Sequence, residues 1–178
     1  MDLSEQDLKK IKSLHVMLKM PIWILERETN RVLKSYKSIY KHPISYEFKE
    51  KNISDEVVRF YSGMLNEIFL CLWYQDVRIV IGAFRINNVT STEFSHVYDN
   101  LTPENKKILS EKECWEYYSS LPVYPLGDIR DYLILLGFLF DMNLEEIYSE
   151  ELHKQVGENQ LELVRKSAED TAYETFHG

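Results

Sequence analysis

Two apolar runs rich in β-forming residues dominate the centre of the chain. They lie within Glu67–Arg85, EIFLCLWYQDVRIVIGAFR, and a short polar break separates them. Valine, isoleucine and aromatic side chains suit a buried pleated surface, and a short polar break between two such runs is typical of a hairpin turn. The pattern therefore predicts a buried antiparallel hairpin at the centre of a sheet.

A second hairpin is predicted upstream. Its two runs are PIWILERE (Pro21–Glu28) and RVLKSY (Arg31–Tyr36), which flank Thr29-Asn30. Two hairpins with helical patterns between and after them predict an α+β fold, with an antiparallel sheet of at least four strands and flanking helices.

Two helices are predicted before the central hairpin. Residues 4–19 have apolar positions at helical spacing, with Ser4 and Asp7 as a capping-box-like start, and Pro21 stops the pattern. Residues 54–65 show a similar period after an acidic start. Residues 37–52 have no clear period, so we expect a loop there, either a lid or a surface connection.

Helices are also predicted after the central hairpin. Ser91 or Thr92 can cap a short one, and Thr102-Pro103-Glu104 starts another that runs through Tyr118. From Asp128 a helix is apolar almost all round, so we expect it to be buried.

Beyond Met142 the chain becomes charged and sparsely apolar, which predicts an extended connecting helix. We therefore expect a sensory or regulatory α+β domain over residues 1–142 and a connecting helical segment over residues 143–178. The connecting helix contains an imperfect heptad seam, which either pairs in a homodimer or docks on its own domain. The seam residues are Leu152, Val156, Asn159 and Leu163.

Composition restricts the class of partner. The chain has 178 residues, 44% hydrophobic and 13% aromatic, which suits one globular domain with an appendage. A formal net charge of -8 repels the negatively charged phosphate backbone of nucleic acids. We therefore expect this piece by itself to bind protein or small molecules rather than nucleic acid. Its charged, periodic N-terminus and the lack of a long apolar run predict neither a secretion signal nor a membrane segment. Two cysteines without framework spacing favour a reducing, cytoplasmic location.

No catalytic or metal-binding pattern is visible. The histidines lie far apart, so we expect no metal and no cofactor; they are His15, His42, His96, His153 and His177. Cys71 is flanked by apolar strand residues, which favours a neutral buried thiol over a nucleophile. The chain lacks the glycine-rich phosphate and dinucleotide motifs and the nucleophile elbow, and Gly82 is an isolated strand glycine typical of a close contact or bulge. We expect no enzyme.

The remaining candidate site is the lining that a curved sheet would present on one side. It either packs on helices as plain core or lines a ligand pocket, with Arg78 or Arg85 as nearby polar groups. The residues expected on this side are Trp23, Leu25, Leu70, Leu72, Tyr74, Val80, Gly82 and Phe84.

The arrangement resembles sensory sheets of the PAS and GAF type. More specifically, the chain resembles the N-terminal domains of AraC/XylS-type transcriptional regulators of Gram-positive bacteria, including regulators of YSIRK surface antigens. The resemblance covers nearly the whole chain, and Ala83 departs from the proline that the family often has. The matching stretches are MPIWILERETNRVLKSY, IVIGAF, YYSSLPVYPLGDIRDYLILLGFLF and ENQLELVRKSAEDTAYETFHG.

This resemblance implies a ligand-sensing and dimerisation domain of a cytoplasmic transcription factor. It implies a homodimer, a small-molecule or peptide effector, and DNA binding only through C-terminal helix-turn-helix units that are absent here. An alternative is an input or scaffold module of another signalling protein, such as a histidine kinase. A small enzyme would need a cluster of titratable groups in one cleft.

Overall fold

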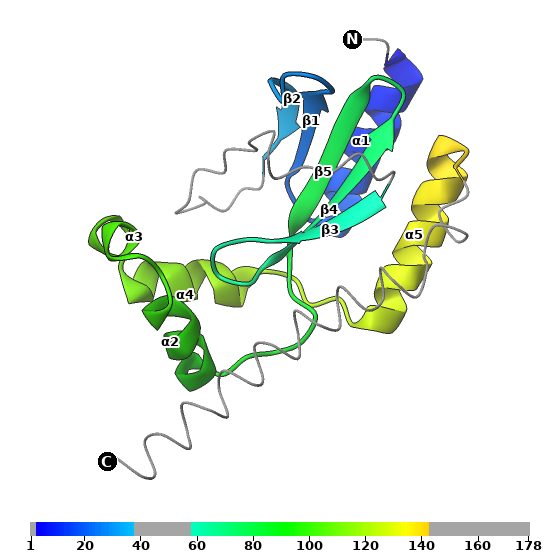
Figure 1. Ribbon diagram of the computed structural model, residues 1–178. Helices are drawn as coiled ribbons and strands as arrows, with labels where there is room; N and C mark the ends of the chain where they lie inside the picture. Colours follow the sequence, from blue (N-terminus) through cyan, green and yellow to red (C-terminus); the bar gives the residue numbers. More distant parts are fainter. Residues whose placement is uncertain (1–2, 38–57, 143–178) are drawn as a thin grey trace, which may run out of the picture.

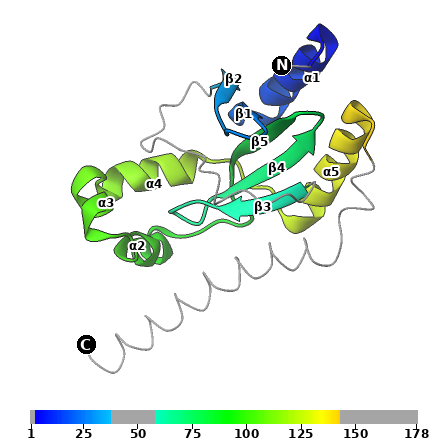
Figure 2. The ribbon, with the colours of Figure 1, turned by 45° about the horizontal axis from the view of Figure 1, so that its top comes forward.

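The computed structural model describes residues 3–37 and 58–142. Within them, five strands form one antiparallel sheet of order β2-β1-β5-β4-β3, with helices on both sides (Figures 1 and 2). The predicted α+β fold is therefore confirmed. The elements are α1 (Glu5–Leu18), β1 (Ile22–Glu26), β2 (Val32–Tyr36), β3 (Val58–Ser62), β4 (Ile68–Tyr74), β5 (Val77–Phe84), α2 (Ser91–Asp99), α3 (Pro103–Ile108), α4 (Glu111–Ser120) and α5 (Leu126–Phe140).

Helix α1 begins at the predicted cap. The Asp7 N–H donates to Ser4 Oγ at 3.1 Å, and the Ser4 N–H donates to Asp7 Oδ2 at 3.2 Å, so both partners of a capping box are present. The helix ends at Lys19, whose φ of 56° is left-handed. This cap turns the chain into β1.

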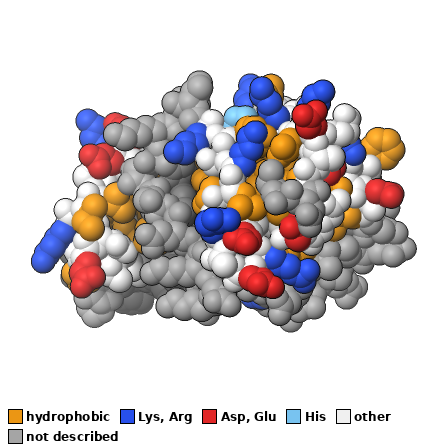
Figure 3. Space-filling view, turned by 90° about the horizontal axis from the view of Figure 1, so that it is seen from above, with side chains coloured by type: hydrophobic (Ala, Val, Ile, Leu, Met, Phe, Trp, Pro, Cys, Tyr) orange, Lys and Arg blue, Asp and Glu red, His pale blue; other side chains and the backbone are white. Residues whose placement is uncertain are grey.

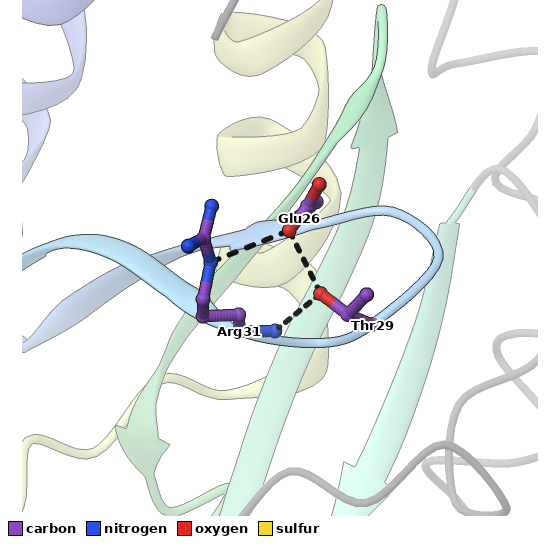
Figure 4. Close-up of polar contacts among 3 residues, drawn as sticks. All are labelled: Glu26, Thr29 and Arg31. Carbon is purple, nitrogen blue, oxygen red and sulfur yellow. Dashed lines mark hydrogen bonds and ion pairs between the residues drawn. The ribbon is translucent and has the colours of Figure 1, made fainter.

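The hairpin β1–β2 has a longer connection than the predicted Thr29-Asn30 pair. Thr29 Oγ1 donates to Glu26 Oε2 at 2.8 Å and accepts from the Arg31 N–H at 3.3 Å, and Arg31 Nε lies 3.4 Å from Glu26 Oε2 (Figure 4). Asn30 has a φ of 57°, which asparagine tolerates. Side chains of the turn therefore close the hairpin after Glu26.

The central hairpin β4–β5 is confirmed. Tyr74 pairs with Val77 across the turn, where Gln75 has a φ of 53°. Every residue of β5 is buried, since β1 and β4 flank this strand and helices cover both of its faces.

The helix predicted over residues 54–65 is wrong for the part that the structure describes. Residues 58–62 form the edge strand β3, in which Val58 pairs with Leu72 and Phe60 with Leu70. The buried residues Val58 and Phe60 alternate with more exposed ones, and pairing satisfies the backbone groups along β4. The helix start proposed at residues 54–56 lies outside the described residues.

Capping residues mark where helices α2, α3 and α4 begin. Helix α2 is capped by Thr90, one residue before the predicted Ser91, and α3 by Thr102 with proline in its first turn, as predicted. The single helix predicted from Thr102 to Tyr118 is two helices, because Leu109 is extended (φ -118°, ψ 117°) and Ser110 starts α4. Ser110 Oγ accepts the Glu113 N–H at 3.1 Å.

Helices cover the sheet on both faces, and each face has its own core. The α1/α5 core joins α1 and α5 to strand residues such as Ile24, Leu72 and Ile79, which lie opposite one another in the pairing register. The α2/α4 core joins α2 and α4 to the alternate strand residues, such as Cys71 and Val80. Figures 1 and 2 show α2, α3 and α4 as a group apart from α5.

Some predictions fall outside the described residues. These are the loop over residues 38–52, the connecting helix over residues 143–178, and its seam residues Leu152, Val156, Asn159 and Leu163. In the ranges that the structure describes, none of the helices has the length and apolar character needed to cross a bilayer.

Candidate apolar cavity beneath helix α5

The predicted pocket residues do not share one side of the sheet. Leu70, Leu72, Tyr74 and Phe84 belong to the α1/α5 core, whereas Trp23, Leu25 and Val80 belong to the α2/α4 core on the opposite face. The expectation of a single lining is therefore wrong, because side chains alternate between faces along each strand and Trp23 pairs directly with Val80.

A small cavity of about 30 Å³ lies in the α1/α5 core. Its floor is the sheet, and its walls come from the end of α1, from the chain before α5, and from α5 itself. All of the lining side chains are apolar or tyrosine: Leu18, Met20, Phe60, Leu70, Ile81, Phe84, Tyr124, Ile129, Tyr132 and Leu136. This volume holds about one or two water molecules. Of the eight residues that the sequence placed on one side of the sheet, Leu70 and Phe84 line it.

Backbone pairing positions Tyr124 at the edge of this cavity. The Arg85 N–H donates to the Pro122 carbonyl at 2.8 Å, and the Tyr124 N–H donates to the Arg85 carbonyl at 2.7 Å. This short bridge lays the chain before α5 alongside the end of β5. Two prolines, Pro122 and Pro125, restrict the same segment.

The hydroxyl of Tyr124 links the chain before α5 to the end of α1. It donates to the Leu18 carbonyl at 2.9 Å, at the end of α1. Its ring lies 5.9 Å from the Phe84 ring and 4.8 Å from the Tyr132 ring, both edge-on. Burial raises the pKa of Tyr124 to about 12, and Tyr132 adds to this rise. The phenol therefore stays protonated and acts as a donor at neutral pH.

Met20 and His15 complete the α1 side. His15 Nδ1 lies 2.7 Å from the Met20 carbonyl, a distance that fits donation from the ring N–H. This contact holds the turn between α1 and β1, so Met20 stays against the cavity. Polar contacts from two separate parts of the chain thus fix a site that is otherwise apolar.

Arg78 and Arg85, the two arginines expected near a pocket, do not line this cavity. Arg78 lies on the opposite face, where Nη1 donates to Asn30 Oδ1 at 2.9 Å and the guanidinium stacks 3.9 Å from the Trp73 ring centre. Arg85 is buried and donates to the carbonyls of Leu121 at 3.0 Å and Ser119 at 3.2 Å. It therefore satisfies the last carbonyls of α4, where a cation is favourable.

The described residues hold no metal-ligand cluster of three or more histidine, cysteine or carboxylate side chains. Cys71 and Cys114 are buried and unbridged. Burial raises the pKa of Cys71 to about 12, so its thiol is protonated at neutral pH, as the sequence predicted. Gly82 lies beside a register shift, where an added Cβ would fall 2.5 Å from the Phe69 ring, which confirms the predicted close contact.

Sequence reasoning missed most of the cavity. The pattern predicts no helix or strand over residues 121–126, so it gives Tyr124 no role, and it places Phe60 on a helix. Ile129, Tyr132 and Leu136 were recognised only as parts of an apolar helix. Their spacing of three and four residues marks one face of α5, and this spacing was a usable signal.

Comparisons of the chain with models of protein families, with curated proteins and with solved structures found no match.

Proposed function

We propose that this chain is the sensory part of a transcriptional regulator of the AraC/XylS type, and that it detects a small apolar effector at the cavity beneath α5. The single observation that carries the sensing role is the position of this cavity. It lies between the central sheet and α5, the last described helix before residues 143–178. The assignment to a regulator family is supported by the sequence resemblance described above.

The size of the cavity suggests how sensing would work. Small-molecule sites usually enclose several hundred Å³, and this cavity has about 30 Å³. An effector larger than a water molecule or two therefore requires α5 to move away from the sheet. Such a ligand binds one position of α5 better than the other, which is the condition for a ligand to shift a conformational equilibrium.

The lining suggests the class of effector. Among the described residues, the polar groups at the cavity are tyrosine hydroxyls, and Tyr124 already donates to Leu18. A charged effector would lose its hydration without a partner of opposite charge. We therefore expect a neutral, largely apolar molecule.

Native mass spectrometry of the purified chain tests this proposal. We expect an added mass on the parent protein that is absent from Leu136→Phe, because the larger side chain fills the cavity. The matched control is Ile108→Phe, at an exposed position of α3, which should keep the added mass. A parent protein that stays bare, even after incubation with a cell extract of small molecules, would contradict effector sensing, and a bare dimer would favour a dimerisation module instead.

A further inference from the structure

The side chain of Arg85 holds the end of α4. Several lysine and arginine side chains lie on the surface, as Figure 3 shows, whereas Arg85 is only 8% exposed. Its guanidinium donates to the Leu121 carbonyl through Nε at 3.2 Å and through Nη2 at 3.0 Å, and to the Ser119 carbonyl at 3.2 Å. A buried charge is tolerated where hydrogen bonds satisfy it, and charged donors make the stronger bonds. Moving the end of α4 away from Arg85 would therefore be costly.

The backbone of the same residue holds the wall of the cavity. The Arg85 N–H donates to the Pro122 carbonyl at 2.8 Å, and the Arg85 carbonyl accepts the Tyr124 N–H at 2.7 Å. Tyr124 also contacts the ring of Phe84, the residue before Arg85, and both tyrosine and phenylalanine line the cavity. Side chain and backbone of one residue thus bind a continuous stretch, residues 119–124.

This stretch joins the two faces of the sheet. Tyr118, in the α2/α4 core, has its ring centre 5.3 Å from the Arg85 guanidinium, whereas Tyr124 packs against the α1/α5 core. Figure 1 shows the chain from α4 to α5 passing the end of β5, where the sheet no longer separates the two cores. Pro122 and Pro125 restrict the backbone there. A displacement of the cavity wall should therefore reach the end of α4.

We propose that Arg85 is a positioning residue that couples the cavity wall at Tyr124 to the end of α4. The inference goes beyond effector detection, because this coupling needs no ligand. One consequence does rest on the proposed function. An effector that moves α5 would also displace the wall, and Arg85 would carry that change to the helices on the opposite face of the sheet.

Amide chemical shifts in proton–nitrogen correlation spectra of the full 178-residue chain test the coupling. Tyr124→Phe perturbs the wall, because it removes the hydroxyl that donates to the Leu18 carbonyl. We expect this substitution to shift the amide signals of Ser119 and Leu121 in the parent protein. In an Arg85→Met background the same substitution should shift them less than half as far, because methionine keeps an apolar stem but lacks the guanidinium.

Arg78→Met is the matched control. Arg78 is a second buried arginine, on β5, and its Nη1 donates to Asn30 Oδ1 at 2.9 Å rather than to α4. In this background, Tyr124→Phe should shift the Ser119 and Leu121 signals as far as in the parent. Chemical shifts compare folded molecules, so a general loss of stability would not imitate the expected difference. Equal shift changes in Arg85→Met and in the parent, or none in the parent, would overturn the proposal.

Arg85→Lys decides the question if Arg85→Met does not fold. Lysine keeps the positive charge, but its ammonium group lacks the planar fork that reaches both carbonyls. The shift changes caused by Tyr124→Phe should therefore again fall below those of the parent, and changes of full size would overturn the proposal. None of these readouts involves an effector, so failure of the coupling and failure of effector sensing can be told apart.

Discussion

At the scale of single residues, buried and partly buried polar side chains join parts of the chain that are distant in sequence. Tyr124 donates to Leu18 across 106 positions, and Arg85 satisfies carbonyls at the end of α4. Tyr74 similarly donates to Asp7 at 3.1 Å, which ties the end of β4 to the start of α1. Leaving a buried carbonyl without its donor costs more than a hydrogen bond contributes on average. These side chains therefore help to hold the helices against the sheet.

Removing the Tyr124 hydroxyl should lower stability by a predictable amount. We expect Tyr124→Phe to reduce the free energy of unfolding at pH 8 by about 1 to 2 kcal/mol, because the Leu18 carbonyl loses its donor. Urea titrations followed by circular dichroism measure this loss. A free energy of unfolding equal to that of the parent would show that water replaces the hydroxyl at no cost.

The same variant should also change the dependence of stability on pH. The folded-state pKa of Tyr124 is about 12, above the ordinary value of 10.0, so between these values the unfolded chain releases the proton first. The contribution of this protonated phenol to stability is complete below pH 10 and is lost as pH rises toward 12. Tyr124→Phe should therefore lose less stability than the parent between pH 9 and pH 11. Parallel curves for the two proteins would contradict the burial argument.

At the scale of elements, short capping motifs decide where the helices begin. Ser4, Thr90, Thr102 and Ser110 each accept a backbone N–H from the first turn of the helix that follows. The caps at Ser4 and Thr102 were recognisable from sequence, because the capping residue stands before a periodic apolar pattern. The cap at Ser110 was missed, and with it the division between α3 and α4.

The Ser4 cap can be tested against a matched serine in the same helix. We expect Ser4→Ala to lower the free energy of unfolding by about 1 kcal/mol, since the Asp7 N–H loses its acceptor. Ser13→Ala, at an exposed position within α1, should change stability by no more than a few tenths of a kcal/mol. Thermal and urea unfolding of both variants give this comparison. Equal effects of the two substitutions would show that the cap contributes no specific stability.

At the scale of the whole molecule, one sheet separates two cores. Because strand residues alternate between the α1/α5 core and the α2/α4 core, each side chain packs with the helices on its own side. Substitutions in different cores share few neighbours, so their effects on stability should be nearly independent. The cavity beneath α5 belongs to only one of these cores.

A double-mutant cycle tests this independence. Leu133→Ala in the α1/α5 core should cost about 2 to 5 kcal/mol, and Val97→Ala in the α2/α4 core about 1 to 2 kcal/mol. The double variant should lose the sum to within about 0.5 kcal/mol. A coupling above about 1 kcal/mol, measured by urea unfolding, would mean that the sheet transmits repacking from one face to the other.

The amino-acid sequence by itself determined the local elements whose signals are strong and short in range. The central hairpin, the first hairpin, α1 and the start of α3 were all predicted, because period, turn residues and caps act within a few positions. The buried state of Cys71 followed from its apolar neighbours in the same strand. These features need no knowledge of what lies opposite in space.

Only the tertiary structure decided which residues meet. The pattern of residues 58–62 suits a helix or a strand, and the exposed edge of β4 selects the strand. The predicted pocket residues lie on opposite faces of the sheet, because the pairing register sets which face each residue occupies. The cavity likewise combines the end of α1, the sheet, Tyr124 and α5. Its residues are brought together by packing between distant segments, and no local pattern in the sequence encodes that contact.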